Sequence, residues 1–173
     1  MADDDKLQHN KKKNRYRQLN RLQTIIKIKF KDKSLLNRSL IHRSFLNEAG
    51  PGAKDNERLE YLGDSVLALV VNEYLFKHFE HYPEGDLAKI KSAVVSEATL
   101  YKVANEINLG SFLLMGRGEE MSGGRTRPSI LANSLEAVIG AIYLDSGLKA
   151  SKKFVLSLLK RDIERIDSLS TFR

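Results

Sequence analysis

The sequence contains no cysteine and no tryptophan, and only three prolines among its 173 residues. Without cysteine the chain can form neither a disulfide framework nor a cysteine-ligated zinc site, and a reducing compartment suits it best. The longest strictly apolar run, 66–71, is far too short to span a membrane. The acidic first six residues lead into no apolar stretch typical of a secretory signal. We therefore expect a cytoplasmic protein with no membrane association.

The positive charge of the chain is concentrated at its N-terminus. The formal net charge is +7, and residues 1–33 hold eleven Lys and Arg against four Asp, so the remaining residues carry no net charge. We expect residues 1–18 to form a basic N-terminal arm, ordered or disordered. Two interpretations stay open: an arm that attracts a polyanion regardless of its sequence, or a solvated leader without a binding role.

Apolar residues recur at spacings of three and four, which predicts an all-α fold, a multi-helix bundle with one domain over residues 19–168. The expected helices cover 15–28, 35–46, 56–79, 87–107, 128–144 and 150–166. Ser34 and Asp86 are the expected N-caps of the second and fourth helices. The segment 109–127 is rich in glycine and is predicted to be loop-like.

Two of these helices are apolar and carry one isolated carboxylate each. Asp64 is the only charged residue in 61–72, and Glu136 is the only one in 130–144. A lone buried carboxylate costs several kcal/mol unless it is protonated, paired or bound to a cation. We predict that the two helices cross, with Gly63 and Gly140 allowing a close approach, and that the facing carboxylates hold a divalent cation.

Glu57 and Glu60 lie on the same helical stripe as Asp64, because the three are separated by three and four residues. Oxygen ligands of this kind suit a hard cation such as Mg²⁺ or Mn²⁺. The alternative is a solvated helix face, which is the commoner meaning of this spacing. Glu136 favours the metal site, because a solvated face does not carry one charge in fifteen residues.

The segment NERLEYLGDSVL, residues 56–67, closely resembles the signature of the ribonuclease III endonuclease domain. Four further blocks resemble the family in the same order: HRSFLNE (42–48), PEGDLAKIKSAVVS (83–96), LGSFLLMGRGEEMSGGRTRPSILA (109–132) and SLEAVIGAIYLD (134–145). The resemblance implies the all-α endonuclease-domain fold of that family, and a homodimer that hydrolyses double-stranded RNA with Mg²⁺, for which Mn²⁺ can substitute. It also implies a role in processing ribosomal and other structured RNA.

The resemblance assigns roles by position in the matched motifs. It implies metal ligands at Glu60, Asp64, Asn133 and Glu136, catalytic roles for Asp64 and Glu136 among them, and outer acidic positions at Glu57 and Glu84. Such residues would hold the metal that activates a water, and the products would carry 5′-phosphate and 3′-hydroxyl ends. His42 is expected to be a structural hydrogen-bonding residue.

Candidate contacts to RNA and to a partner subunit follow from the same blocks. The basic residues that could touch phosphates are Lys89, Lys91, Arg117, Arg125 and Arg127. The alternative is that these are ordinary surface charges, since Glu119 and Glu120 neutralise much of the local field. Tyr61 stands where the family has an aromatic residue that packs into the partner subunit, and its alternative is a place in the core.

Two departures from the family pattern matter. Asn133 stands where the family most often has Asp, which keeps a carbonyl oxygen but removes one negative charge, so metal affinity should fall. It therefore supports an alternative: a catalytically impaired double-stranded-RNA binder or a structural ribonucleoprotein subunit. Bacterial members also usually continue into a double-stranded-RNA-binding domain, which is absent from this chain. Whether a longer protein was shortened stays open.

Overall fold

The computed structural model describes residues 2–170, with side chains assigned for 6 and 9–166. Within those residues it contains helices and no β-strand, apart from a single bridge between Ile41 and Leu114, so the predicted all-α class is confirmed. The elements are α1 (Ala2–Ile26), α2 (Lys33–Ser39), η1 (Arg43–Phe45), α3 (Leu46–Ala49), α4 (Glu57–His78), α5 (Glu84–Val94), α6 (Glu97–Glu106), η2 (Leu109–Phe112), α7 (Arg117–Met121), η3 (Gly124–Thr126) and α8 (Pro128–Ser170).

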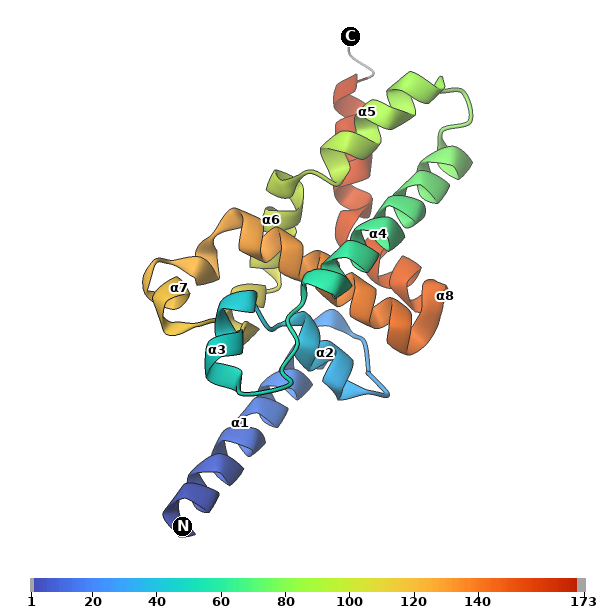
Figure 1. Ribbon diagram of the computed structural model, residues 1–173. Helices are drawn as coiled ribbons and strands as arrows, with labels where there is room; N and C mark the ends of the chain where they lie inside the picture. Colours follow the sequence, from blue (N-terminus) through green and yellow to red (C-terminus); the bar gives the residue numbers. More distant parts are fainter. Residues whose placement is uncertain (1, 171–173) are drawn as a thin grey trace.

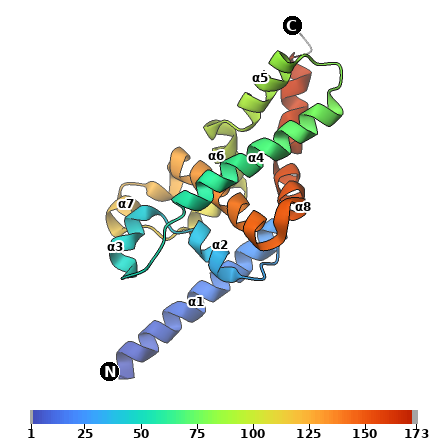
Figure 2. The same cartoon turned by 45° about the vertical axis from the view of Figure 1, so that its right-hand side comes forward.

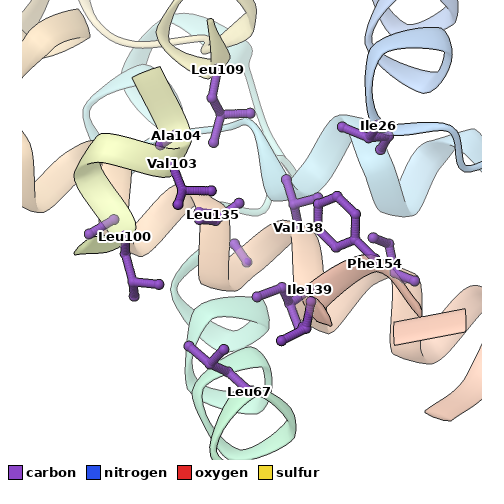
Figure 3. Close-up of a cluster of buried hydrophobic side chains, with 14 of the residues drawn as sticks. Ile26, Leu67, Leu100, Val103, Ala104, Leu109, Leu135, Val138, Ile139 and Phe154 are labelled. Atoms are coloured by element: carbon purple, nitrogen blue, oxygen red, sulfur yellow. The ribbon is translucent and has the colours of Figure 1, made fainter. Parts of the chain in front are cut away.

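Helices α4 and α8 cross at the centre of the molecule, and the shorter elements pack around them (Figures 1 and 2). Figure 3 shows buried apolar side chains of α1, α4, α6, η2 and α8 meeting around the first half of α8. The labelled side chains are Ile26, Leu67, Leu100, Val103, Ala104, Leu109, Leu135, Val138, Ile139 and Phe154. Each large one contributes about 1.5–3 kcal/mol by leaving water, so the crossing is the best-supported part of the fold.

The first helix is longer than its apolar periodicity predicts. It runs from Ala2 to Ile26 instead of 15–28, so most of the predicted arm is helical, with Met1 outside the described residues. Lys27 ends it in the left-handed conformation, with φ 55°. Leu19, Leu22 and Ile26 are buried as expected, whereas Ile25 is 38% exposed, because the inward stripe is narrower than predicted.

The predicted helix over 87–107 is two helices, α5 and α6. Ser96 separates them because its hydroxyl accepts a hydrogen bond from the backbone N–H of Thr99 and caps α6. Helix α5 begins at Glu84, so Asp86 lies in its first turn and is not its N-cap. The N-cap of α2 is likewise Asp32 and not Ser34, and that helix ends early, at Ser39.

The break predicted between the last two helices is confirmed inside α8, at Gly147. This residue has φ 79° and ψ −178°, a combination that only glycine adopts readily. Beyond it the second half of α8 turns and runs toward α5 (Figure 1). The segment expected to be loop-like, 109–127, contains only the short elements η2, α7 and η3. No helix within 2–170 is long and apolar enough to cross a membrane.

Candidate functional site

Helices α4 and α8 are in backbone contact at their crossing. A methyl group on Gly63 would overlap the backbone carbonyl of Glu136, with its carbon 2.6 Å from the carbonyl carbon. A methyl group on Gly140 would overlap the backbone carbonyl of Leu59 in the same way. The two glycines therefore allow the close approach predicted from the sequence. This contact brings the start of α8 beside the first two turns of α4, where Glu60 and Asp64 lie.

A cleft of about 700 Å³ opens at this crossing. Helix α4, the start of α8, the α7 region and the segment before η1 all contribute side chains to it. Its lining consists of His42, Arg43, Asn56, Glu57, Glu60, Tyr61, Asp64, Glu119, Arg127, Ser129, Ile130, Asn133, Ser134 and Glu136. The structure thus brings together the four predicted metal ligands and the outer Glu57 from two helices far apart in sequence.

The carboxylates in the cleft disfavour one another's ionisation. Burial, followed by the nearby Asp64 and Glu60, raises the pKa of Glu136 from 4.5 to about 7. Burial also raises the pKa of Glu60, and the neighbouring Glu57, Asp55 and Asp64 add to that shift. The ion pairs found in the described part of the chain include none to Glu60, Asp64 or Glu136. The cleft therefore holds uncompensated negative charge.

A hard divalent cation fits this donor set. The four candidate ligands offer only oxygen atoms, three of them from carboxylates that repel each other, and a cation would turn that repulsion into coordination. Across residues 2–170, however, no three His, Cys, Asp or Glu side chains are close enough together to hold a metal ion as they stand. The fold therefore gathers the candidate ligands into one cleft without closing them around a single point.

Basic side chains at the rim of the cleft are held by acidic partners. Arg43 lies 3.5 Å from Glu57, and Arg127 is paired with Glu119. Sequence reasoning did not single out Arg43, although the HRSFLNE block contains it. The ring of His42 accepts a hydrogen bond from the backbone N–H of Ser44, 3.3 Å away, and caps η1. This bond gives His42 the structural role expected for it, at a position that also lines the cleft.

Other predicted site residues lie outside the cleft. They are Glu84, Lys89, Lys91, Arg117 and Arg125. Helix α5, which carries the first three, lies beside the far end of α4, away from α7 (Figures 1 and 2). Arg125 is tied inward, because it pairs with Glu120 and donates to the backbone carbonyls of Gly110 and Leu113. The five basic candidates therefore do not form one continuous patch.

Tyr61 is one of the most exposed apolar residues described, with 80% of its surface accessible, so the core alternative for it is wrong. Leu69 and Phe76 are 52% and 74% exposed. The three are separated by eight and seven residues, which places them on one face of α4. By contrast, Val66 and Val70 are buried within the chain. The helix thus presents a narrow apolar face to solvent.

Comparison with known proteins identifies the family of this chain. A family model described as Ribonuclease-III-like matches residues 32–163. The chain belongs to the ribonuclease III family. Ribonuclease 3 of Treponema denticola is 57% identical over 139 residues, which cover 80% of this chain and 56% of that protein. Ribonuclease 3 of Caldanaerobacter subterraneus is 48% identical over 145 residues, covering 84% and 64%. The chain therefore spans less than two thirds of the length of these ribonucleases.

Solved structures of known nucleases have the same fold as this chain. A nuclease domain of ribonuclease III from Campylobacter jejuni, described for structural flexibility in a region involved in dimer formation, superposes with a TM-score of 0.76 at 47% identity. That match covers 82% of this chain and 95% of the other. Dicer from Pichia stipitis matches with a TM-score of 0.60 at 26% identity over 81% of this chain and 59% of that one.

Proposed function

We propose that this chain is a metal-dependent endoribonuclease that hydrolyses phosphodiester bonds in double-stranded RNA, with residues 19–168 as its nuclease domain. The observation that carries this proposal is the cleft at the α4–α8 crossing, where Glu60, Asp64 and Glu136 converge without a basic partner. Family membership supports the same reaction. Its substrates would be ribosomal precursors and other structured RNA, and it would act in the cytoplasm.

The oxygen atoms that line the cleft indicate which residues would bind the metal ion. Glu60, Asp64 and Glu136 would hold Mg²⁺, or Mn²⁺ in its place, through carboxylate oxygens, and Asn133 through its amide carbonyl. Bound there, the ion would supply Lewis-acid polarisation of the phosphodiester and lower the pKa of a bound water. Asp64 and Glu136 are the catalytic carboxylates of this proposal. Glu57 lies farther out, where its pairing with Arg43 orients that guanidinium.

The rim of the cleft would orient the RNA. Arg43 and Arg127 lie in different sequence blocks but line the same cleft, and each is paired with an acidic residue. Arginine binds phosphate oxygens through paired N–H donors, so the two side chains could align the scissile phosphate. Attack by water at phosphorus breaks the bond to the 3′ oxygen, which takes a proton. The products then carry 5′-phosphate and 3′-hydroxyl ends.

We propose that the active form is a homodimer formed through the exposed apolar face of α4. Three large side chains on that face, Tyr61, Leu69 and Phe76, are exposed in the single chain. Isolated exposed apolar residues are common on protein surfaces, but a row of three on one helix is typical of an interface. A two-fold arrangement would place two carboxylate clefts on one assembly, one for each strand.

A cleavage assay on two forms of one RNA tests the proposed function. We expect the chain with Mg²⁺ to cut a long labelled duplex, to leave its single strand intact, and to produce 5′ ends from which a phosphatase removes phosphate. Chelation of the metal should stop the reaction. Duplex that is retarded on a gel but stays uncut at every Mg²⁺ and Mn²⁺ concentration would favour the impaired binder, for which Asn133 is the supporting observation.

A further inference from the structure

The net positive charge of the protein lies in residues 1–33, which contain α1 and the segment that follows it. Residues 6–31 hold ten Lys and Arg and no Asp or Glu. The ion pairs of the described residues all involve residues from Arg43 onwards, so none neutralises this segment. Helix α1 and the segment after it therefore carry concentrated positive charge, against which residues 1–33 hold only Asp3–Asp5 and Asp32, and such charge attracts a polyanion.

One face of α1 carries a stripe of exposed polar residues, Lys6, Lys13, Arg17, Asn20 and Thr24. Their separations of seven, four, three and four residues place them on one side of the helix. The exposed Lys27 follows directly after the helix, and other exposed basic residues, among them Lys11 and Lys12, lie on other sides of it. Leu19, Leu22 and Ile26, which are buried, occupy the opposite side. At 1.5 Å per residue the stripe is about 30 Å long, so it can follow several phosphates of one strand.

The stripe ends in a shallow hollow of about 370 Å³. Three lysines, Lys27, Lys29 and Lys33, line it together with Asn20, Gln23, Thr24 and Ile28. Lys33 is held in place, because its Nζ lies 4.0 Å above the ring of Tyr16 and donates to the Tyr16 hydroxyl at 2.6 Å. The amide of Gln23 and the hydroxyl of Thr24 already donate to Asn20, so the lysine ammonium groups are the donors that this hollow offers to a phosphate group.

Arg15 fixes the direction of the stripe relative to the domain. Its Nε donates to Asn37 at 2.7 Å, and its Nη1 donates to the backbone carbonyl of Phe112 at the same distance. These bonds tie the middle of α1 to α2 and η2. N-terminal to this tie, α1 extends away from the rest of the molecule (Figures 1 and 2). The charged helix therefore extends from the domain in a direction that the bonds of Arg15 hold fixed.

We propose that the stripe and the lysine hollow form a second binding surface, which holds the phosphate backbone of duplex RNA outside the cleft. This inference rests on the proposed function, because it takes the RNA that is cleaved to be the ligand. The contacts are to phosphates, made by Lys13, Arg17 and Lys27 with help from the hollow, and they carry no base specificity. The surface would hold a part of the duplex away from the cut, since the hollow and the cleft share no lining residue.

Equilibrium binding of the full chain to a long RNA duplex in EDTA tests the proposal without cleavage. We expect the variant Lys13→Gln/Arg17→Gln/Lys27→Gln to bind at least about tenfold more weakly, and its slope of log affinity against log salt to fall by about 2–3 units, because three phosphate contacts are lost. The matched control is Lys153→Gln/Lys160→Gln/Arg161→Gln. It removes the same charge from exposed positions on the second half of α8 and should bind within about twofold of the unmodified chain.

Two further measurements make each outcome decisive. The charge-conserving variant Lys13→Arg/Arg17→Lys/Lys27→Arg should restore binding, and circular dichroism should show equal helix content in all four proteins. Equal affinities and salt slopes for the stripe and control variants would overturn the second surface, as would failure of the charge-conserving variant to bind. Duplex cleavage with Mg²⁺ is scored separately. A chain that binds through the stripe but never cuts would refute the proposed function and leave the surface standing.

Discussion

Gly63 lies directly against the backbone carbonyl of Glu136, so close that the smallest side chain would overlap it. The residue that brings the two helices together and the carboxylate with the most raised pKa are therefore parts of one contact. Gly140 repeats the arrangement one turn later, against the backbone of Leu59. The packing of the core and the position of the candidate ligands are thus fixed by the same pair of helices.

The variant Gly63→Ala should destabilise the protein by about 1–3 kcal/mol, because the added methyl group can be accommodated only by moving two helix backbones apart. Gly85→Ala is the matched control. Gly85 is also helical, but a methyl group there would meet nothing within 4 Å, so the change should be neutral or stabilise by up to about 1 kcal/mol. Urea denaturation of both variants gives the comparison. Similar midpoints would refute the close contact at the crossing.

Stability of the metal-free protein should fall as the pH rises from about 4.5 to 7. Across this interval folded Glu136, with a pKa of about 7, keeps a proton that the unfolded chain, with a pKa of 4.5, has lost. Because the folded state then binds more protons, the free energy of unfolding decreases with pH. Glu136→Gln should remove most of this slope and be more stable at pH 8 by about 1–2 kcal/mol, a figure reduced for partial exposure to solvent.

Thermal unfolding in EDTA at pH 5 and pH 8 measures this difference. Glu164→Gln, a change at an exposed carboxylate near the end of α8, serves as the control and should leave the pH dependence of the unmodified chain intact. The account of Glu136 fails if Glu136→Gln and the unmodified chain differ by the same amount at both pH values.

Asn133→Asp should lower the Mg²⁺ concentration at half-maximal cleavage by more than it changes the rate at saturation. The substitution adds one anionic ligand to a site that already has three carboxylates, and affinity for a hard cation rises with the charge of its ligands. Mn²⁺ should support the unmodified chain at lower concentrations than Mg²⁺, since it binds more tightly to weak oxygen sites. The measurement is cleavage rate against metal concentration for both proteins and both metals.

Two outcomes of that titration would change the interpretation. If the curves of the Asn and Asp proteins overlay, residue 133 is not a ligand. If the Asn protein stays silent at every concentration while the Asp protein cuts, the chain is an impaired form and binds RNA without cleaving it.

Tyr61→Asp should weaken the proposed homodimer by at least tenfold in dissociation constant, because it would bury an unpaired charge in an apolar interface. Tyr61→Phe keeps the ring and should leave association unchanged within about twofold. Sedimentation at micromolar concentrations compares the two with the unmodified chain, whose dimer would have twice the 19.6 kDa chain mass. A strictly monomeric unmodified chain would contradict the proposed assembly.

The sequence predicted the centre of this molecule better than its periphery. Isolated carboxylates in apolar helices, and Gly63 and Gly140 beside them, are strong local signals because burial makes each costly or necessary. These signals correctly predicted a close crossing with Glu60, Asp64 and Glu136 in one cleft. The break between the last two predicted helices was also predicted correctly, and it falls at Gly147, whose conformation few other residues adopt.

Features set by a competing local cap or by tertiary contacts could not be predicted from the sequence in the same way. The cap at Ser96 that divides α5 from α6 competes with a continuous apolar pattern, and periodicity alone hides it. Arg125 resembles a free surface cation in sequence, yet backbone carbonyls brought in by η2 hold it inward. The distance of Glu84 from the cleft follows from where α5 packs on α4, which no local spacing encodes.

The central claim is that the carboxylates at the α4–α8 crossing form a metal-dependent centre for cutting duplex RNA. Single-turnover cleavage of a labelled duplex by the unmodified chain and by Glu136→Gln, with RNA binding measured alongside in EDTA, tests it most directly. We expect Mg²⁺-dependent cutting that falls at least about a thousandfold in the variant, while its affinity for the duplex is retained. Cleavage by Glu136→Gln at the unmodified rate, or the same cleavage without any divalent cation, would contradict the claim.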